Sequence, residues 1–213
     1  MFFLLILAGI LSFHDGAFSA EKAKPLTFDV VVDKEVDERF FGRENFLNLL
    51  DEIFKAASSV FEREIGRSFE INNIRFVEPP PETREKIFVL IDKTKIWIQF
   101  ALIDKTEIWI QKEFYDTRSD KILFITPNRF TYKSSPKLIN GSAPDEKLLL
   151  VHFPLFENDQ SLITLLHELG HTCGATHDND NGTNQIMHNM TTLYLSFDDA
   201  NRAIIKRNCG PGK

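Results

Sequence analysis

The sequence predicts a single domain of the α/β (α+β) class, with a mixed and mostly parallel sheet, one long helix and a second helix that carries the functional side chains. The first observation is size, because 213 residues, 43% of them hydrophobic, allow one domain with a sizeable core but hardly two. The second is order, because strand-like, helix-like and strand-like segments follow one another near the N-terminus. The third is a helix-like apolar run that ends in closely spaced histidines.

Three N-terminal segments establish this order. Residues 26–32 are rich in β-branched side chains and predict a first strand. Residues 44–64 carry apolar side chains in steps of three and four, which predicts a long amphipathic helix. Residues 69–77 predict a second strand, which the proline run 79–81 ends. A strand, a helix and a strand in this order favour parallel pairing of the two strands.

The next segment contains an internal repeat. Residues 90–99 and 102–111 have the same sequence except at one position. Because Asp-Lys-Thr suits a turn, we predict a three-stranded meander over residues 86–114, a duplicated β insertion at the edge of the domain. Two copies make neither a solenoid nor a propeller. An alternative role is an exposed aromatic patch of Trp97 and Trp109 that binds substrate.

The second half of the chain predicts two more strands and a terminal helix. Residues 120–126 and 147–153 are apolar and strand-like, while residues 127–146, rich in proline, serine, asparagine and lysine, predict a loop. Strand 147–153 is one option for an edge strand at which an extended peptide pairs. Residues 196–207 predict a helix that begins at a serine N-cap.

The functional side chains gather in residues 167–178, HELGHTCGATHD. Helix positions four apart share one face, so His167 and His171 point to a common centre. Two neutral imidazoles at this spacing bind a divalent metal, and Glu168 beside the first can polarise a metal-bound water. Gly174 allows the left-handed conformation in which a helix ends and turns sharply.

A third histidine completes the predicted site, because the turn can return His177 as a ligand and leave one coordination position open. Three protein ligands with an open fourth position are typical of a catalytic zinc site, whereas four ligands close a structural one. The alternative is an ordinary helix with solvated histidines, which the further matches at Gly174 and Asp178 disfavour. His152, on an apolar strand, and His188 are predicted not to be ligands.

The spacing H-E-x-x-H-x-x-G-x-x-H resembles the signature of the metzincin metalloproteases, which carry a methionine turn further on. Met187 resembles that methionine, which in the family lies beneath the metal as a hydrophobic floor. Asp178, after the third histidine, is similar to the adamalysin (reprolysin) branch, whereas astacins have glutamate and matrixins usually serine there. Astacins also have a tyrosine two residues past the methionine, where this chain has Asn189.

The resemblance implies a zinc endopeptidase with a metzincin-type catalytic domain over residues 20–213. His167, His171 and His177 would hold Zn2+, and Glu168 would accept a proton from the attacking water and pass it to the leaving amine. The expected substrates are extracellular proteins or peptides. Two other interpretations stay open: a secreted, non-catalytic binding protein on a metalloprotease scaffold, and a structural zinc domain, which the open fourth position disfavours.

The N-terminus predicts secretion. Residues 2–11 are apolar and small residues follow at 17–20, so we expect a signal peptide over residues 1–19, cleaved near Ser19 or Ala20. A single-pass anchor is the alternative, because the basic segment that normally precedes the apolar run is missing.

Composition and cysteine count narrow the partners and the compartment. The net charge of -6 argues against a nucleic-acid partner. No segment after residues 2–11 is apolar enough to cross a membrane. We expect the protein to be a monomer. Cys173 and Cys209 suggest one disulfide in a secreted chain, with two free thiols as the alternative. Asn140, Asn181 and Asn189 begin N-glycosylation sequons, which predict a glycoprotein.

Overall fold

The computed structural model describes residues 23–91, 94–132, 135–154, 158–177, 185–187 and 195–213. Within them the strands form two sheets. The larger sheet has the order β2 (Phe69–Val77), β1 (Leu26–Asp33), β5 (Lys121–Thr126), β9 (Leu148–His152), β8 (Gly141–Ser142). The smaller sheet has the order β3 (Arg84–Ile91), β4 (Thr94–Leu102), β6 (Phe130–Tyr132), β7 (Ser135–Ile139).

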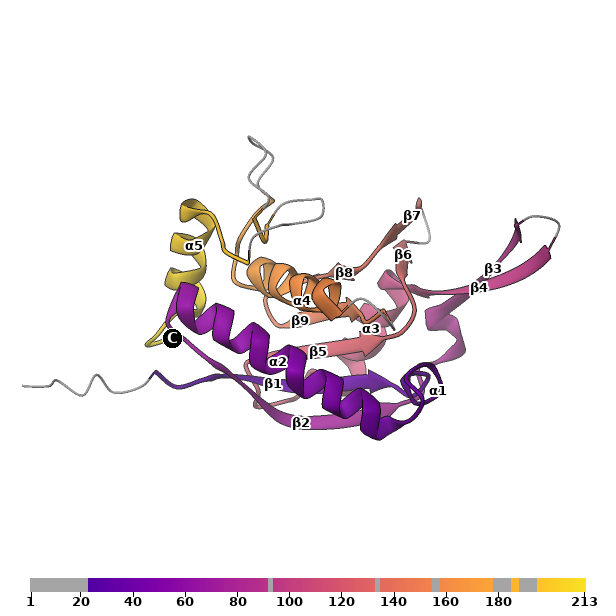
Figure 1. Ribbon diagram of the computed structural model, residues 1–213, viewed down its shortest axis with the longest axis horizontal. Coiled ribbons are helices and arrows are strands. Elements are labelled where there is room, and N and C mark those ends of the chain that lie inside the picture. Colours follow the sequence, from indigo (N-terminus) through magenta and orange to yellow (C-terminus); the bar gives the residue numbers. More distant parts are fainter. Residues whose placement is uncertain (1–22, 92–93, 133–134, 155–157, 178–184, 188–194) are drawn as a thin grey trace, which may run out of the picture.

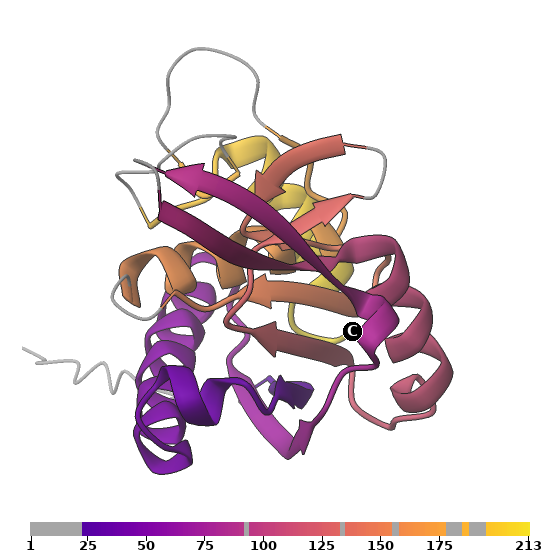
Figure 2. The same ribbon diagram turned by 90° about the vertical axis from the view of Figure 1, so that its right-hand side faces the viewer.

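The larger sheet is mixed and mostly parallel, as predicted. Strand β1 pairs in parallel with β2 and with β5, and β5 pairs in parallel with β9, whereas β8 runs antiparallel to β9. Helices α2 (Arg43–Ile65) and α4 (Asn158–Thr172) cover one face, and α3 (Ile103–Phe114) covers the other (Figures 1 and 2). The remaining helical segments are α1 (Val36–Arg39), the 3-10 turn η1 (Pro81–Thr83) and α5 (Asp199–Cys209).

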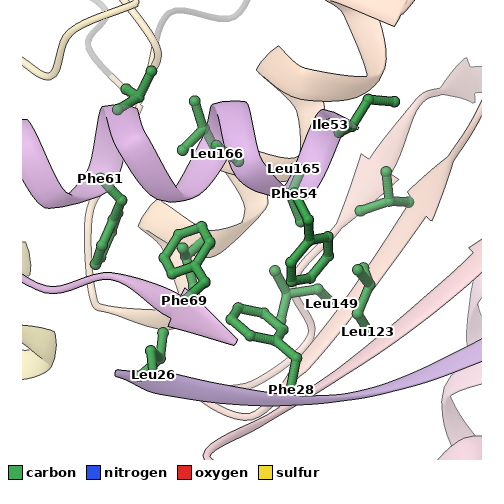
Figure 3. Close-up of a cluster of buried hydrophobic side chains, with 14 of the residues drawn as sticks. Leu26, Phe28, Ile53, Phe54, Phe61, Phe69, Leu123, Leu149, Leu165 and Leu166 are labelled. Atoms are coloured by element: carbon green, nitrogen blue, oxygen red, sulfur yellow. The ribbon is translucent and has the colours of Figure 1, made fainter. Parts of the chain in front are cut away.

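The apolar stripe of α2 forms the main core against this sheet (Figure 3). The rings of Phe54 and Phe28 lie 5.3 Å apart between their centroids, and those of Phe61 and Phe69 lie 4.9 Å apart. Each fully buried ring stabilises the fold by about 1.5–3 kcal/mol. The helix ends at Gly66, whose φ of 92° is the left-handed conformation that glycine adopts without strain. The core therefore fixes α2 and the sheet as one unit.

The predicted three-stranded meander over residues 86–114 is wrong in its second half. Residues 90–99, the first copy of the repeat, run from β3 into β4, which pair as an antiparallel hairpin, but the second copy forms α3. In helical spacing Ile103, Thr106 and Ile110 fall on one face, and all three are buried. Nearly the same ten residues therefore adopt two structures, because tertiary packing overrides a local preference that fits both.

Trp109 does not form the exposed aromatic patch considered above. Its ring is half-buried and packs edge-on against Phe124 of β5 and Phe114 of α3, with centroid distances of 5.8 and 5.5 Å. The side chain of Trp97 lies outside the described part of the chain. Trp109 therefore packs against the core, between α3 and the larger sheet.

The edge of the larger sheet is β8, and not the strand predicted at residues 147–153. Strand β9 occupies that segment and pairs with β5 on one side and with β8 on the other, where Gly141 faces Val151. The sequence predicts a loop over residues 127–146, but β6, β7 and β8 lie there. Such short strands do not show the alternation that identifies a strand in a sequence.

The C-terminal helix begins later than predicted. Its N-cap is Asp198 and not Ser196, because the Asp198 carboxylate accepts a hydrogen bond of 2.8 Å from the Asn201 backbone N–H. Phe197, between the two, is fully buried and packs on Phe61. This anchor holds the segment before the helix against the core.

Cys173 and Cys209 form a disulfide, which confirms the predicted bridge and excludes the two free thiols. The bond joins the residue after α4 to the last residue of α5. The C-terminal helix is thereby attached to the end of the helix that carries the histidines.

The predicted signal peptide, residues 1–19, lies outside the described residues, as do the sequons at Asn181 and Asn189. Among the described helices, none combines the length and the apolar character needed to cross a membrane.

Candidate metal centre

Helix α4 presents two of the predicted site residues on one face. Its apolar side, formed by Leu165, Leu166 and Leu169, is fully buried against the core. His167 and His171 lie one turn apart and are half-buried. The packing of the leucines therefore sets the rotation of the helix and, with it, the direction of both imidazoles.

The end of α4 is a sharp reversal at Gly174, as predicted. Gly174 has a φ of 87°, and its N–H donates to the His171 carbonyl at 2.8 Å. The N–H of Ala175 donates to the Gly170 carbonyl at 2.9 Å. These two bonds form the Schellman arrangement that closes a helix with a left-handed residue. The chain turns back over the helix end and brings His177 to the other two histidines.

The three histidines converge on one point. Their Nε2 atoms are separated by 3.1 Å between His167 and His171, 3.2 Å between His167 and His177, and 3.0 Å between His171 and His177. Together they form a cluster that could hold a metal ion. The structure therefore brings together the three ligands that the sequence predicts.

Hydrogen bonds fix the tautomers of the two helix histidines. Nδ1 of His167 lies 2.7 Å from the Ile186 carbonyl oxygen, and Nδ1 of His171 lies 2.9 Å from the Ala175 carbonyl oxygen. A carbonyl oxygen only accepts, so each Nδ1 carries the proton and each neutral ring has its lone pair on Nε2. Lone pairs that converge repel one another unless a cation lies between them. The short Nε2 separations therefore favour a bound metal.

The environment of His167 and His177 favours their neutral forms. Burial lowers the pKa of His167 to about 4. Burial also lowers the pKa of His177, with further contributions from the charges of His171 and Lys137. A metal binds only the neutral form of histidine, so these shifts remove proton competition at neutral pH.

The spacing of the nitrogens fits zinc. With Zn–N bonds of about 2.0–2.1 Å and a tetrahedral angle, two ligand nitrogens lie about 3.3–3.4 Å apart. The observed separations of 3.0–3.2 Å are close to this value. Two carbonyl acceptors behind the rings of His167 and His171 provide the outer hydrogen bonds that orient metal-binding imidazoles.

The predicted methionine, Met187, packs against the helix that carries His167 and His171. Its side chain is fully buried. A Cβ atom on Gly170 would lie only 2.5 Å from the Met187 sulfur, so the sulfur packs directly on the backbone of α4 between the two helix histidines. The preceding carbonyl, that of Ile186, accepts the hydrogen bond from His167. Residues 186 and 187 thus pack against α4 and orient one histidine ring.

Glu168 is buried next to the histidines, and the edge strand lies directly against it. A Cβ atom on Gly141 would lie 2.6 Å from Glu168 Oε1 and 2.8 Å from Thr164 Cγ2, so only glycine fits there without a shift. Burial raises the pKa of Glu168 to about 8. A dication held by the histidines would favour the carboxylate form.

Polar side chains that the sequence did not single out hold the end of α4. The buried ammonium of Lys121 donates to the Thr172 carbonyl at 3.3 Å, and Asn208 donates to the Cys173 carbonyl at 2.9 Å. Asn201 bonds to the backbone of Thr176. The sequence alone shows only that these residues are polar, because the backbone groups they bond to are distant in the chain.

The other predicted residues lie elsewhere or outside the described chain. His152 is buried at the end of β9 and is not part of the histidine cluster, in agreement with its predicted exclusion. Asp178, His188 and Asn189 lie outside the described residues. The sequon residue Asn140 adjoins β8, and its carbonyl accepts from the His152 N–H at 2.7 Å.

A comparison with protein-family models matches residues 24–205 to metallo-peptidase family M12. A comparison with curated protein sequences finds no match. The family match covers both the described core and the histidine cluster.

Solved structures share the fold at low sequence identity. An archaemetzincin from Methanopyrus kandleri has a TM-score of 0.59 and 16% identity, covering 86% of this chain and 95% of that one. An archaemetzincin from Archaeoglobus fulgidus, complexed with malonate, has a TM-score of 0.53 and 10% identity, with coverages of 84% and 99%. A chain in a chaperone–substrate complex has a TM-score of 0.58 and 10% identity, with coverages of 88% and 35%. The mixed, mostly parallel α/β architecture is thus that of archaemetzincin structures.

Proposed function

Because this chain belongs to metallo-peptidase family M12, we propose that it is a zinc-dependent endopeptidase whose metal is held by His167, His171 and His177. The observation that carries the proposal is the convergence of the three Nε2 atoms at separations of 3.0–3.2 Å. The adamalysin branch is part of the proposal and rests on Asp178, which follows the third histidine.

The reaction needs a base next to the attacking water. When bound, zinc supplies Lewis-acid polarisation of the scissile carbonyl and makes water acidic enough to attack near neutral pH. The Glu168 carboxylate accepts the proton of that water and later donates it to the leaving amine. Its burial keeps bulk water away and strengthens its interactions with neighbouring charges.

Strand β8 is the proposed docking edge for the peptide. It is the last strand of the larger sheet in the described chain, and the edge that faces away from β9 can pair with an extended substrate. Gly141 of β8 lies against Glu168, so a peptide paired with β8 runs past the base. We propose that this pairing aligns the scissile bond with the histidine cluster.

The variant Gly141→Ala tests this arrangement. The added methyl group cannot fit unless Glu168 or β8 moves, so we expect kcat/KM to fall by about 10- to 100-fold while zinc content is unchanged. Steady-state kinetics and metal analysis measure both quantities. Ser142→Thr, which adds a methyl group on the same strand and keeps the sequon that begins at Asn140, is the matched control and should retain wild-type kinetics. Wild-type activity in the glycine variant would show that the contact between β8 and Glu168 is not needed.

We further propose that the protein is a secreted monomeric glycoprotein acting on extracellular proteins or peptides. The disulfide between Cys173 and Cys209 supports an oxidising compartment. The apolar segment at residues 2–11 supports a cleaved signal peptide. Expression in a eukaryotic host tests whether the protein is secreted, and retention in the cell would contradict secretion. N-terminal sequencing tests signal cleavage, mass determination tests glycosylation, and gel filtration tests the monomeric state.

Zinc analysis combined with peptide cleavage tests the main proposal. The purified protein is assayed on a peptide library with blocked N- and C-termini, because only an endopeptidase cuts such substrates. We expect one zinc per chain, internal cleavage, loss of cleavage with a chelator and recovery with added zinc. A protein without zinc would contradict the metal centre. Zinc without any cleavage would favour the non-catalytic binding protein instead.

A further inference from the structure

The backbone immediately before the third histidine is held by one side chain. The amide of Asn201 accepts from the Thr176 N–H at 3.0 Å and donates to the Thr176 carbonyl, also at 3.0 Å. Both backbone groups of Thr176 are thus paired with a single side chain, as in a strand pair. Thr176 directly precedes His177, so this contact acts one residue away from a site residue.

Asn201 is itself held rigidly. It is 5% exposed, and its Nδ2 donates to the Asp198 carboxylate at 2.6 Å in addition to Thr176. Its backbone N–H donates to the same carboxylate, which is the N-cap of α5. In a capping box the side chain at this helix position reaches back to the N-cap backbone. Here the amide bonds both to the side chain of the N-cap residue and to the backbone of the loop, so it links the start of α5 to Thr176.

Helix α5 is anchored to the end of α4 at its other end. The Cys173–Cys209 disulfide and the bond from Asn208 to the Cys173 carbonyl connect the two helices. These links hold the residue right after α4. The bonds of Asn201 hold the loop three residues later, where it turns towards His171 and His167.

His177 depends on its backbone more than the other two histidines do. His167 and His171 are half-buried on a packed helix, whereas the side chain of His177 is exposed. Packing therefore does little to place this imidazole. An exposed ligand on a loop needs a fixed main chain to keep its nitrogen near the other two.

We propose that Asn201 is a positioning residue for the third metal ligand: its amide fixes the Thr176 backbone so that His177 completes the site. The inference rests on the proposed zinc site. Removal of the amide leaves a zinc site with two fixed histidines and one mobile histidine. Outer contacts of this kind change metal affinity by about 10- to 100-fold when they are removed.

The test is zinc affinity of Asn201→Ala, measured by competition with a chromophoric chelator. We expect the zinc Kd to rise by about 10- to 100-fold. Thr176→Ala is the matched control, because it changes the side chain and keeps both backbone groups, and its Kd should equal that of wild type. A Kd in Asn201→Ala within about threefold of wild type would overturn the proposal.

Two further measurements separate positioning from folding. Circular dichroism and the Tm of the metal-free variant report whether α5 is intact, and positioning predicts a rise in Kd with a metal-free Tm close to that of wild type. If Asn201→Ala does not fold, Asn201→Ser replaces it, and the same changes in zinc Kd decide the outcome. The serine hydroxyl can still bond to Asp198, but the side chain is too short to pair with both backbone groups of Thr176. Failure of wild type to bind zinc would instead contradict the proposed function.

Discussion

Replacement of Glu168 by glutamine is expected to reduce peptide cleavage by about 10²- to 10⁴-fold, the range that a positioned general base contributes. Glutamine has the same shape and fits the same buried space under Gly141, but it cannot accept a proton at neutral pH. The three histidines are untouched, so we expect the variant to keep one zinc per chain, as in wild type. The loss should appear in kcat rather than in KM.

The control for this variant is a glutamate outside the site. Glu52 is exposed on α2, so Glu52→Gln removes the same charge and should leave kcat unchanged. Stopped assays on the blocked peptide library, with metal analysis of each preparation, provide the comparison. If Glu168→Gln cut peptides at the wild-type rate with zinc bound, another group would have to be the base.

Removal of the disulfide is expected to lower the free energy of unfolding by about 4 kcal/mol. Cys173 and Cys209 are 36 residues apart, and an open loop of that length gains much conformational freedom in the unfolded chain. Against a total of about 5–15 kcal/mol, this is a large part of the stability. The double variant Cys173→Ser/Cys209→Ser avoids leaving one reactive thiol.

Urea unfolding of the metal-free protein measures this loss. Wild type in reducing agent should unfold at the same urea concentration as the double variant, and the reducing agent should leave the double variant unchanged. Both samples should unfold well below oxidised wild type. Equal midpoints for all samples would mean that the bond does not stabilise the native chain.

The helix of residues 44–64, the first two strands and the cluster of histidines could all be predicted because each has a local signal. Steps of three and four place the apolar residues of α2 on one face, and H-E-x-x-H places two imidazoles on one face of α4. Gly174 marked the reversal that returns His177, and the structure has it at a φ of 87°. For these elements the local spacing of apolar residues was enough for a correct prediction, because the core buries the same faces that the spacing indicates.

The repeat shows where local signals fail. Residues 90–99 and 102–111 carry nearly one sequence, yet the first copy is a hairpin and the second is α3. Ile103 and Ile110 of the second copy are buried in one apolar cluster with Ile122 and Phe124 of the larger sheet, and this packing favours the helix. The short edge strand β8 was likewise invisible, because its two residues pair only through β9.

The sequence by itself determined the identity of the histidines and Glu168, the order of the main elements and the spacing that makes a metal site possible, since these depend on residues a few positions apart. Only the tertiary structure decided that Gly141 lies against Glu168, that Met187 packs under Gly170, and that Asn201 pairs with Thr176. Those partners are distant in sequence, and their contacts arise from the packing of whole helices and sheets, which no local pattern encodes.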